Sequence, residues 1–417
     1  MPTAVGLSLP GTTMSPYLLA DDLSGALESG AAFRARGWSV SLPLTNETAP
    51  FSRGNLEVVS TETRNAATLE AAAIIRRLVA ARRATGAPLL FKKIDSTLRG
   101  PIAAELNALI TELAPPLVVI CPANPLEGRT VIRGIVRVNG VPLEQTAFSG
   151  DPVWPATSGD LRARLAVQGL VVHAHIGLEV IAGGAPAIAR YISNTVEEHA
   201  DTVVLTSDAL TFFDLRALVE GALTTEPASV LVGSGALGRV IAEHLPTPAP
   251  AAAPAVVTSG PLVVLCGSRH PASHRQIEIL VRDCGALELI THPHDPMPPL
   301  IDRIVAAIDE RRPVAVRCKP TRLGVGSEAI PLWLAEVAVA LLAKRRPGVL
   351  YLTGGETAFA VCRHLGGARL EVLRELAPGV VLSELIFPSR PALQIISKPG
   401  GFGDPRSLAE VCVEIMK

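Results

Sequence analysis

The chain has 417 residues, of which 48% are hydrophobic and 18% charged, and 38 Lys and Arg against 39 Asp and Glu give a formal net charge of −1. This length predicts two or three domains with sizeable cores, and the near-zero charge removes the electrostatic case for a nucleic-acid or polybasic membrane partner. The apolar content excludes general disorder, while apolar runs such as 117–123 and 262–267 are too short to span a bilayer.

The N-terminal residues and the cysteines indicate the compartment. Residues 1–16 lack the cationic start and the long apolar stretch of a secretory signal. The cysteines are Cys121, Cys266, Cys284, Cys318, Cys362 and Cys412. They are widely spaced and form no CxxC pair, so we interpret them as reduced thiols in the core. We therefore expect a cytoplasmic protein.

From residue 16 to residue 233, short runs rich in Val, Ile and Leu alternate with longer helical patterns. Continuous apolar strands that alternate with helices indicate a buried, mainly parallel sheet. Strands are predicted at 16–22, 56–63, 88–94, 117–121, 202–207 and 229–233. Helices are predicted at 24–36, 65–84, 102–113, 178–198 and 210–222. Residues 122–175 are rich in Gly, Pro and Arg with weak periodicity, and they are predicted to form a long functional loop.

Residues 245–261 form the clearest break in composition. Pro and Ala recur there without a charged residue, which is typical of an extended, semi-rigid linker, so we expect domains at 15–244 and 262–417. In the second domain, strands are predicted at 262–267, 286–291, 313–319, 349–353 and 392–397. Helices are predicted there at 273–283, 299–311, 331–343, 357–365 and 404–416. The sequence thus predicts an α/β fold of two domains, each with a mainly parallel sheet flanked by helices.

In open α/β sheets, ligands bind beyond the carboxyl ends of the strands, so residues that follow a strand are candidates for a site. Arg64 follows the second predicted strand, and the segment from Lys93 to Arg99 follows the third. Arg64, Lys93 and Arg99 can neutralise a carboxylate, and the hydroxyl of Ser96 can donate a hydrogen bond to it.

Two carboxylates accompany these cations. Asp22, which follows the first predicted strand, and Asp95 can accept hydrogen bonds from hydroxyl groups, and either can receive a proton as a general base. Taken singly, each residue has a structural interpretation as a helix N-cap, a turn residue or a solvated side chain. Because three strand ends carry such groups together, we favour a site for a small anionic, polyhydroxylated ligand.

The second domain carries Gly-rich turns between strands and helices. Gly354 to Thr357 follow one predicted strand, residues 398–404 follow another, and Gly267 and Ser268 follow a third. Such turns place backbone N–H groups and a helix N-terminus where a phosphate docks, and Lys398 is a candidate to meet a triphosphate. The alternative is that these are ordinary strand–helix turns.

Two other patterns are interpreted as structural. Residues 233–238 match GxGxxG, but no Asp or Glu occurs at the expected distance of about 20 positions, so we do not predict NAD(P) binding. The pairs His173/His175 and His292/His294 lack a Cys or carboxylate at ligand spacing and are expected to be surface or turn histidines. We assign no metal ligands from the sequence.

With these segments in order, the chain resembles the four-carbon acid sugar kinase family. The resemblance covers nearly the whole chain, and its specific part is ADDLSGA at 20–26 together with KKIDSTLRG at 92–100. The other matching pieces are TETR (61–64), CPANPLEGRTVIRG (121–134), GSGALG (233–238), GS…Q (267–276), TGGET (353–357) and KPGGFG (398–403).

The resemblance implies that one domain binds a four-carbon sugar acid and the other binds ATP, with phosphorylation of the terminal C4 hydroxyl. D-Threonate and D-erythronate are favoured over 3-oxo-tetronate. The implied acid-binding residues are Asp22, Arg64, Lys93, Ile94, Asp95, Ser96 and Arg99. The implied ATP-binding residues are Ser268, Gly354, Gly355, Glu356, Thr357, Lys398, Gly401 and Gly403. The chain departs from the family pattern on the nucleotide side, at 269–273 and at 380–381.

For the reaction we expect in-line phosphoryl transfer, with Mg²⁺ on the phosphate oxygens. Asp22 is the first candidate for the base that activates the hydroxyl, and Asp95 is the second. Arg64 and Lys93 would hold the substrate carboxylate, so replacing Arg64 by Ala is expected mainly to weaken substrate binding. The alternatives are a non-catalytic sugar-acid sensor, which the changed segment 269–273 favours, and an NAD-dependent sugar-acid dehydrogenase. A homodimer is the base-rate expectation.

Overall fold

The computed structural model of the protein describes residues 15–44, 55–151, 153–226, 228–246, 260–293, 295–319 and 329–416. These residues group into two compact units. The first unit contains the described residues of 15–38 and 55–246, and the second contains those of 39–44 and 260–416. Most of the linker predicted at 245–261 lies outside the described residues.

The first unit is built on a sheet with the strand order β3-β1-β4-β11-β5-β10-β9, in which each neighbouring pair is parallel. The strands are β1 (Tyr17–Ala20), β3 (Asn55–Ser60), β4 (Leu89–Lys93), β5 (Leu117–Cys121), β9 (Ala174–Ile176), β10 (Val203–Ser207) and β11 (Val230–Gly233). All five residues of β5 are buried. Burial on both faces explains why such strands read as continuous apolar runs, and it confirms the parallel sheet predicted for this part of the chain.

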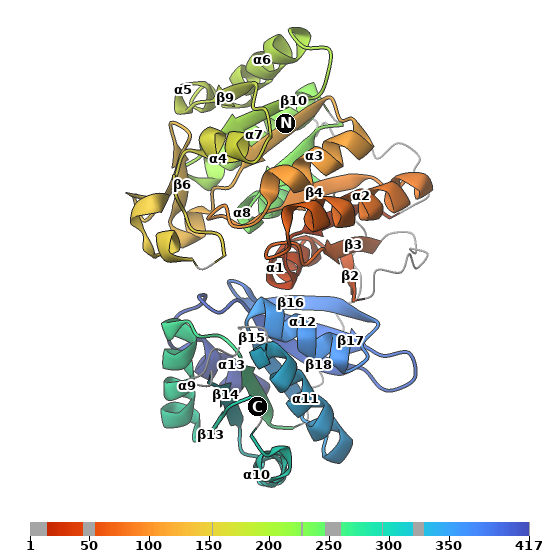
Figure 1. Ribbon diagram of the computed structural model, residues 1–417, viewed down its shortest axis with the longest axis vertical. Coiled ribbons are helices and arrows are strands. Elements are labelled where there is room, and N and C mark those ends of the chain that lie inside the picture. Colours follow the sequence, from red (N-terminus) through yellow and green to blue (C-terminus); the bar gives the residue numbers. More distant parts are fainter. Residues whose placement is uncertain are drawn as a thin grey trace. The chain divides into compact units, whose positions relative to one another are not determined.

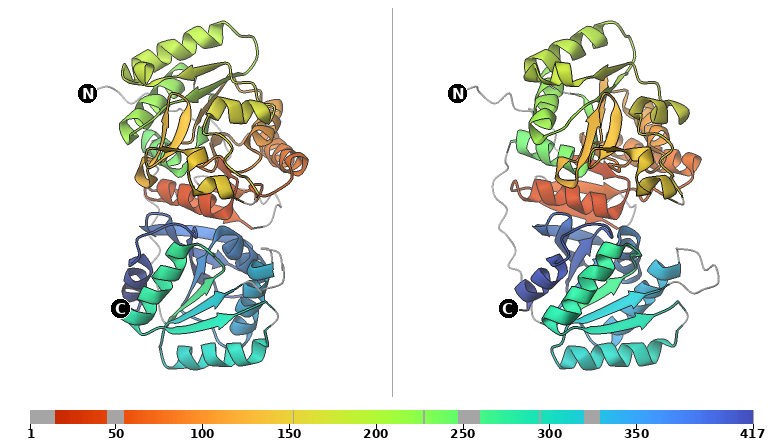
Figure 2. Two further views of the ribbon diagram at one scale, coloured as in Figure 1. Left: turned by 60° about the vertical axis from the view of Figure 1, so that its left-hand side comes forward. Right: turned by 90° about the vertical axis from the view of Figure 1, so that its left-hand side faces the viewer.

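Helices cover both faces of this sheet. Helices α6, α7 and α8 lie on one face, and α2 and α3 lie on the other (Figures 1 and 2). The bounds are α1 (Leu23–Arg34), α2 (Thr68–Thr85), α3 (Ile102–Leu113), α6 (Gly184–Glu197), α7 (Phe212–Thr225) and α8 (Gly235–His244). The single helix predicted at 178–198 is wrong, because a short helix α5 (Leu178–Ile181) precedes α6. Gly184, at the start of α6, has a φ of +70°, which an α-helix does not accommodate.

The segment 122–175, predicted as a long loop, contains regular structure. It includes helix α4 (Leu161–Val167) and an antiparallel sheet of β6 (Arg129–Ile132), β7 (Ile135–Val138) and β8 (Val141–Pro142). Arg133–Gly134 and Asn139–Gly140 connect these strands, with φ values of +54°, +75°, +50° and +81°. Two consecutive residues with positive φ are typical of two-residue β-hairpin turns, for which Asn-Gly is a strong sequence signal. The loop prediction overlooked that signal.

The second unit has a sheet with the strand order β13-β14-β12-β15-β18-β17-β16-β2. The strands are β2 (Ser39–Pro43), β12 (Leu262–Cys266), β13 (Leu287–Thr291), β14 (Val314–Cys318), β15 (Val349–Thr353), β16 (Arg369–Ala377), β17 (Val380–Ile386) and β18 (Leu393–Lys398). The first five in the order are parallel, and β17, β16 and β2 extend them antiparallel. None of these three strands is predicted from the sequence, and residues 39–43 are expected in the first domain.

Helices also cover both faces of the parallel part of this second sheet. Helices α9 and α13 pack together on one face, and α10, α11 and α12 lie on the other (Figure 2). The bounds are α9 (Pro271–Cys284), α10 (Met297–Asp309), α11 (Ala329–Lys344), α12 (Gly355–His364) and α13 (Ser407–Ile415). The core between the sheet and the α9/α13 layer includes Val264, Leu280, Tyr351, Ile396 and Leu408. Within the described part of the chain, no helix has the length and apolar character needed to cross a membrane.

Candidate functional site

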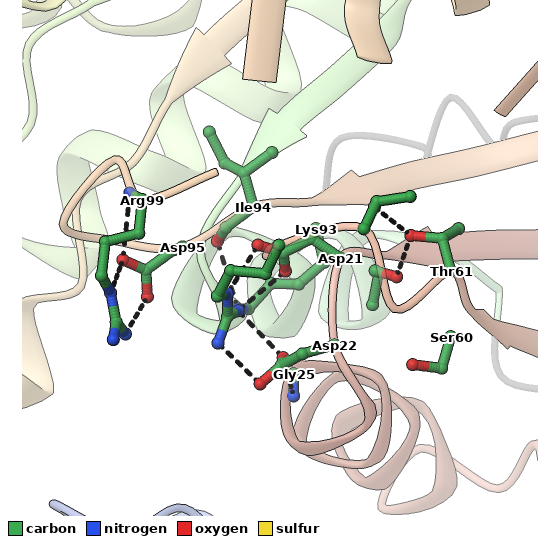
Figure 3. A network of polar contacts seen from close by, with 12 residues as sticks. Asp21, Asp22, Gly25, Ser60, Thr61, Lys93, Ile94, Asp95 and Arg99 are labelled. Carbon is green, nitrogen blue, oxygen red and sulfur yellow. Dashed lines mark hydrogen bonds and ion pairs between the residues drawn. The ribbon is translucent and has the colours of Figure 1, made fainter. Parts of the chain in front are cut away.

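The predicted acid-binding residues lie at one edge of the first sheet. Because β3, β1 and β4 are parallel neighbours, their carboxyl ends meet there. Asp22 follows β1, and Lys93 and Asp95 lie at and just after the end of β4 (Figure 3). Arg64 lies in the segment after β3. The structure therefore brings together residues that are up to about 70 positions apart in the sequence.

Arg64 is the centre of this cluster. Its Nε and Nη2 donate to Asp21 over 2.9 and 2.8 Å, and its Nη1 and Nη2 donate to Asp22 over 2.6 and 2.9 Å. Burial alone would raise the pKa of Asp21, but the charges of Arg64 and Lys93 outweigh it and lower that pKa. Asp21 was not among the predicted site residues, although it stands beside Asp22 in the same motif.

Asp22 also closes the first turn of helix α1. Its Oδ1 accepts the backbone N–H of Gly25 over 2.8 Å, which confirms the N-cap interpretation for a side chain that also lies in the cluster. A Cβ on Gly25 would lie 2.8 Å from Asp22 Oδ1 and 2.9 Å from Lys93 Nζ. The absence of a side chain at Gly25 therefore lets the Lys93 ammonium approach the start of α1.

The two lysines of β4 point to different partners. Lys92 is fully buried and pairs with Glu105 of α3 over 2.7 Å. Lys93 is 5% exposed, and its Nζ donates to the carbonyl of Ile94 over 3.1 Å. Successive side chains of a strand point to opposite faces, so Lys92 stabilises the packing of α3 while Lys93 lies at the cluster.

Asp95 is held by Arg99. Arg99 Nε and Nη2 donate to the two oxygens of Asp95, each over 2.9 Å, and the N–H of Thr97 adds a third bond over 3.2 Å. Burial would raise the pKa of Asp95, but Arg99 and Arg64 hold it well below its usual value. Asp95 is thus an ionised carboxylate that orders the 95–99 turn, and its lowered proton affinity makes it a weak candidate base. Ser96 in this turn is partly exposed.

The charges in the cluster compensate one another. The three cations Arg64, Lys93 and Arg99 face the carboxylates of Asp21, Asp22 and Asp95, and Arg99 also lies 3.8 Å from the carboxylate of Asp151. A substrate carboxylate would therefore meet donors whose charge is already largely balanced. An anion would therefore bind at this edge of the sheet through the placement of hydrogen-bond donors and not through an excess of positive charge.

Two acidic residues near the cluster were missed by the sequence analysis. Glu62 has a φ of +52°, and burial raises its pKa to about 8 although the hydroxyl of Ser60 donates to it. Glu127 pairs with Arg129 over 2.8 Å, and burial raises its pKa to about 7. Asp22 acts on the pKa of Glu62, and Lys93 acts on that of Glu127, which places both groups beside the cluster. No sequence pattern marks Glu62. Its positive φ, which is rare for residues other than Gly, is visible only in the structure.

Replacing Glu62 by Gln is expected to remove a pH dependence of stability. The carboxyl keeps its proton up to about pH 8 when folded but loses it near pH 4.5 when unfolded, so its stabilising contribution disappears as the pH rises between these values. Relative to the wild type, Glu62→Gln should gain at least about 1.4 kcal/mol of unfolding free energy between pH 5 and pH 8, the equivalent of one pKa unit. Urea unfolding at both pH values measures this difference. Glu220→Gln, at an exposed position on α7, is the control. If the difference in unfolding free energy between Glu62→Gln and the wild type were the same at pH 5 and pH 8, as expected for the control, the role of Glu62 would be contradicted.

The predicted nucleotide-binding turns also meet at one edge, in the second unit. Strands β12, β15 and β18 are parallel neighbours, and the turns after them contain Gly267–Ser268, Gly354 and Gly400. A Cβ on Gly267 would lie 2.1 Å from Thr357 Oγ1, and one on Gly400 would lie 2.2 Å from Ser268 Oγ. The backbone N–H of Gly354 donates to the carbonyl of Lys398 over 2.8 Å. Glycine is thus required where the three turns approach one another.

The N-terminus of α12 opens at this edge. Gly354 is its N-cap with a φ of +104°, Gly355 and Glu356 follow in the first turn, and Thr357 is buried behind them. The first N–H groups of a helix have no partner within it and favour an anion. This end of a ten-residue helix, next to two glycine turns, can hold phosphate groups.

Lys398 does not point out of this edge. It is 1% exposed, and its Nζ donates to the carbonyls of Phe402 and Gly400 over 2.9 and 3.2 Å. Gly401 and Gly403, predicted to contact ATP, lie in the same loop and are exposed. In this structure, the ammonium of Lys398 binds the loop itself.

The patterns that were interpreted as structural have packing partners. A Cβ on Gly233, Gly235 or Gly238 of the GxGxxG match would lie 2.1, 2.3 or 2.9 Å from Cys121, Glu28 or Phe91, respectively, so these glycines serve the packing of β11 and α8.

His175 is a partly buried structural residue, because its ring nitrogens bond Thr206 over 2.9 Å and Asp208 over 3.1 Å. His294 lies outside the described residues. Across the described ranges, no three His, Cys, Asp or Glu side chains form a group that could hold a metal ion. The six cysteines are free thiols, and five of them are buried.

Comparison with known proteins covers both units. Residues 17–241 match a family model described as a sugar-binding N-terminal domain, and residues 263–408 match one described as a nucleotide-binding C-terminal domain. The chain is 33% identical to the D-threonate kinase of Cupriavidus necator, over 95% of this chain and 96% of that protein. It is 27% identical to the D-erythronate kinase of Heliobacterium modesticaldum, over 96% of each. A solved Haemophilus influenzae protein, 22% identical, matches 96% of this chain and 100% of its own with a TM-score of 0.74, which shows a shared fold.

Proposed function

This chain belongs to the four-carbon acid sugar kinase family, and on that premise we propose that it transfers a phosphoryl group from ATP to the C4 hydroxyl of a four-carbon sugar acid. D-Threonate and D-erythronate are the favoured substrates, and 3-oxo-tetronate is the alternative within the same class. The observation that carries the proposal is the cluster of Asp22, Arg64 and Lys93 at the ends of β1, β3 and β4, in the part of the chain that matches the sugar-binding model.

We assign the substrate carboxylate to Lys93 and Arg64. Arg64 uses four N–H···O bonds on Asp21 and Asp22, and a guanidinium has five N–H groups. Its fifth N–H, together with the Lys93 ammonium beside Gly25, can bind one carboxylate. The hydroxyl of Ser96 is a further donor for the acid.

We assign the proton of the C4 hydroxyl to Asp22. The Asp22 side chain is 17% exposed and accepts three hydrogen bonds, from Gly25 and Arg64. Asp95 is 10% exposed, accepts five hydrogen bonds from Thr97 and Arg99, and has a pKa held well below its usual value. A carboxylate fixed by a helix N-terminus and by Arg64 keeps one position while it accepts a proton, which suits general-base catalysis.

The glycine turns of the second unit fit a nucleotide, because side chains are excluded from Gly267, Gly354 and Gly400 and the α12 N-terminus is open there. Ser268, Gly354 to Thr357, Gly401 and Gly403 would hold its phosphates. ATP would supply the phosphoryl group, and Mg²⁺ would neutralise the negative charge that develops during the transfer. No protein ligand is assigned to Mg²⁺.

The location and assembly of the protein belong to the same proposal. A reaction that uses ATP, together with free, mostly buried thiols, supports the cytoplasm as its compartment. The expected homodimer stays a prediction.

A coupled assay for nucleoside diphosphate release tests the proposal. Purified protein with ATP and Mg²⁺ should release ADP only when D-threonate, D-erythronate or 3-oxo-tetronate is added, and the ratio of kcat/KM values across this panel identifies the substrate. Saturable binding of an acid without any ADP release, under conditions where ATP binds, would contradict the proposal.

A sugar-acid sensor without catalysis is the second candidate. It is favoured by His270, which belongs to segment 269–273, where the chain differs from the family pattern. A Cβ on Gly401 would lie 3.3 Å from Nε2 of His270, so the imidazole lies against the glycine loop. Calorimetric titration with ATP separates the two functions, since a sensor that has lost transfer through this segment should bind the acid but not the nucleotide.

A further inference from the structure

The loop after β18 has its carbonyl oxygens turned toward two buried donors. Gln276 of α9 and Lys398 at the end of β18 are each 1% exposed. Lys398 Nζ donates to Phe402 O over 2.9 Å and to Gly400 O over 3.2 Å. Gln276 Nε2 shares its two hydrogens among Phe402 O at 3.0 Å, Gly403 O at 3.2 Å, Asp404 O at 3.0 Å and Ser407 Oγ at 3.1 Å.

This set of bonds determines where the loop amides point. The C=O and N–H groups of one trans peptide point in opposite directions, and the described residues contain no cis peptide bond. When the carbonyls of Gly400, Phe402 and Gly403 point into the unit, the N–H groups of the next residues point out of it. Those are the N–H groups of Gly401, Gly403 and Asp404.

The packing of the loop agrees with this orientation, because its inner side is tightly packed and its outer side is exposed. On the inner side, a Cβ on Gly403 would lie 2.8 Å from Ser407 Oγ and 3.1 Å from Gln276 Nε2. On the outer side, Gly401, Gly403 and Asp404 are exposed. The loop therefore presents three amides at the edge where the turns after β12 and β15 also lie.

We propose that Gln276 and Lys398 are a positioning pair that holds these three amides toward the phosphates of the nucleotide, and that Lys398 acts through the loop rather than by touching a phosphate. The inference rests on the proposed function, because it takes a nucleotide as the ligand of the second unit. Phe402 O is the shared acceptor, so the contributions of the two donors are coupled.

The charge of Lys398 adds a pH dependence. Burial lowers the pKa of Lys398 to about 8, against an opposing effect of Cys266. The other titratable groups that face it are Cys266 of β12, whose pKa is raised to about 11 by burial, and His270 at the start of α9, whose pKa is lowered by burial and by the charges of Lys398 and His274. Neither changes its charge between pH 7.5 and about 9.5. Over that range Lys398 loses its proton, and its bonds to the loop carbonyls weaken.

Nucleotide affinity in Gln276→Leu, Lys398→Met and the double variant tests the pair. Calorimetric titration with ATP at pH 7 should show that each single variant binds ATP about tenfold more weakly than the wild type. The increase in Kd of the double variant should be smaller than the product of the two single increases. The KM for the acid should stay unchanged. Lys344→Met, which removes an exposed lysine paired with Asp302, is the control and should bind ATP like the wild type.

Four results separate the interpretations. Unchanged ATP affinity in the folded single variants would overturn the pair, as would weak binding in Lys398→Met with normal binding in Gln276→Leu, which indicates direct contact by Lys398. If a variant fails to fold, the KM of the wild type for ATP from pH 7 to pH 9.5 decides, because it should rise about tenfold with a midpoint near the pKa of about 8. A flat profile would overturn the role of the Lys398 charge. A wild type that binds no ATP at pH 7 would instead overturn the proposed function.

Discussion

Replacing Asp22 by Asn is expected to lower kcat by about 100- to 10,000-fold while the fold stays intact. The amide oxygen of Asn can still accept the N–H of Gly25 and cap helix α1, because Asn and Asp are equally good N-caps. The amide cannot accept the proton of the C4 hydroxyl, so the variant isolates the chemical role of the carboxylate from its structural role.

Steady-state kinetics with the preferred acid, together with a urea unfolding curve, measures both effects. Asp160→Asn is the matched control, because Asp160 caps helix α4 through Ala163 N over 2.9 Å at a partly exposed position and is not one of the cluster carboxylates. It should leave kcat unchanged. If Asp22→Asn turns over within about twofold of the wild type, Asp22 is not the base.

Replacing Arg64 by Ala is expected to destabilise the protein by about 3–5 kcal/mol and to raise the KM for the acid. Removing the guanidinium leaves the Asp21 carboxylate, 4% exposed, and the Asp22 carboxylate, 17% exposed, without their shared cation. The sequence alone predicts mainly weaker substrate binding, whereas the structure adds a large loss of stability, because Arg64 bonds both carboxylates.

Urea unfolding of Arg64→Ala and of Arg216→Ala distinguishes the buried cluster from an ordinary ion pair. Arg216 also makes two bonds to a carboxylate, that of Glu243, but the pair is 48% and 34% exposed, so its loss should cost no more than about 1 kcal/mol. Adding Asp21→Asn to Arg64→Ala should recover part of the stability, since it removes a buried charge. Equal losses in the two Arg variants would contradict this account of the cluster.

The parallel strands could be predicted from the sequence because burial on both faces leaves a continuous apolar run, as in the LVVIC of β5. Strand β16 could not, because its sequence RLEVLRELA consists mostly of good helix formers. It is a strand because it pairs with β17 on one side and with β2 on the other. The pairing with β2 depends on residues more than 300 positions away, which no local pattern contains. The pairing with β17 is a hairpin around Pro378-Gly379, a local turn signal that was overlooked in the sequence.

The candidate site, like the fold, could be predicted only in part from the sequence. The rule that ligands lie beyond strand ends finds Asp22, Arg64 and Lys93, because the order of parallel strands brings those ends together. It does not find Glu62, since its raised pKa comes from burial by the folded chain. Nor does it show that Lys398 points inward, because its acceptors Gly400 and Phe402 take their orientation from contacts of the folded loop.

The most direct test of the proposed reaction is the proton-coupled ³¹P NMR spectrum of the product formed from ATP and D-threonate or D-erythronate. The C4 carbon of these acids carries two hydrogens and the C2 and C3 carbons carry one each, so a phosphate on C4 gives a triplet and one on C2 or C3 gives a doublet. We predict a triplet that grows with ADP in equal amounts and is absent without ATP. A doublet, or the absence of any phosphorylated acid while both ligands bind, would contradict the assignment of this protein as a C4 kinase.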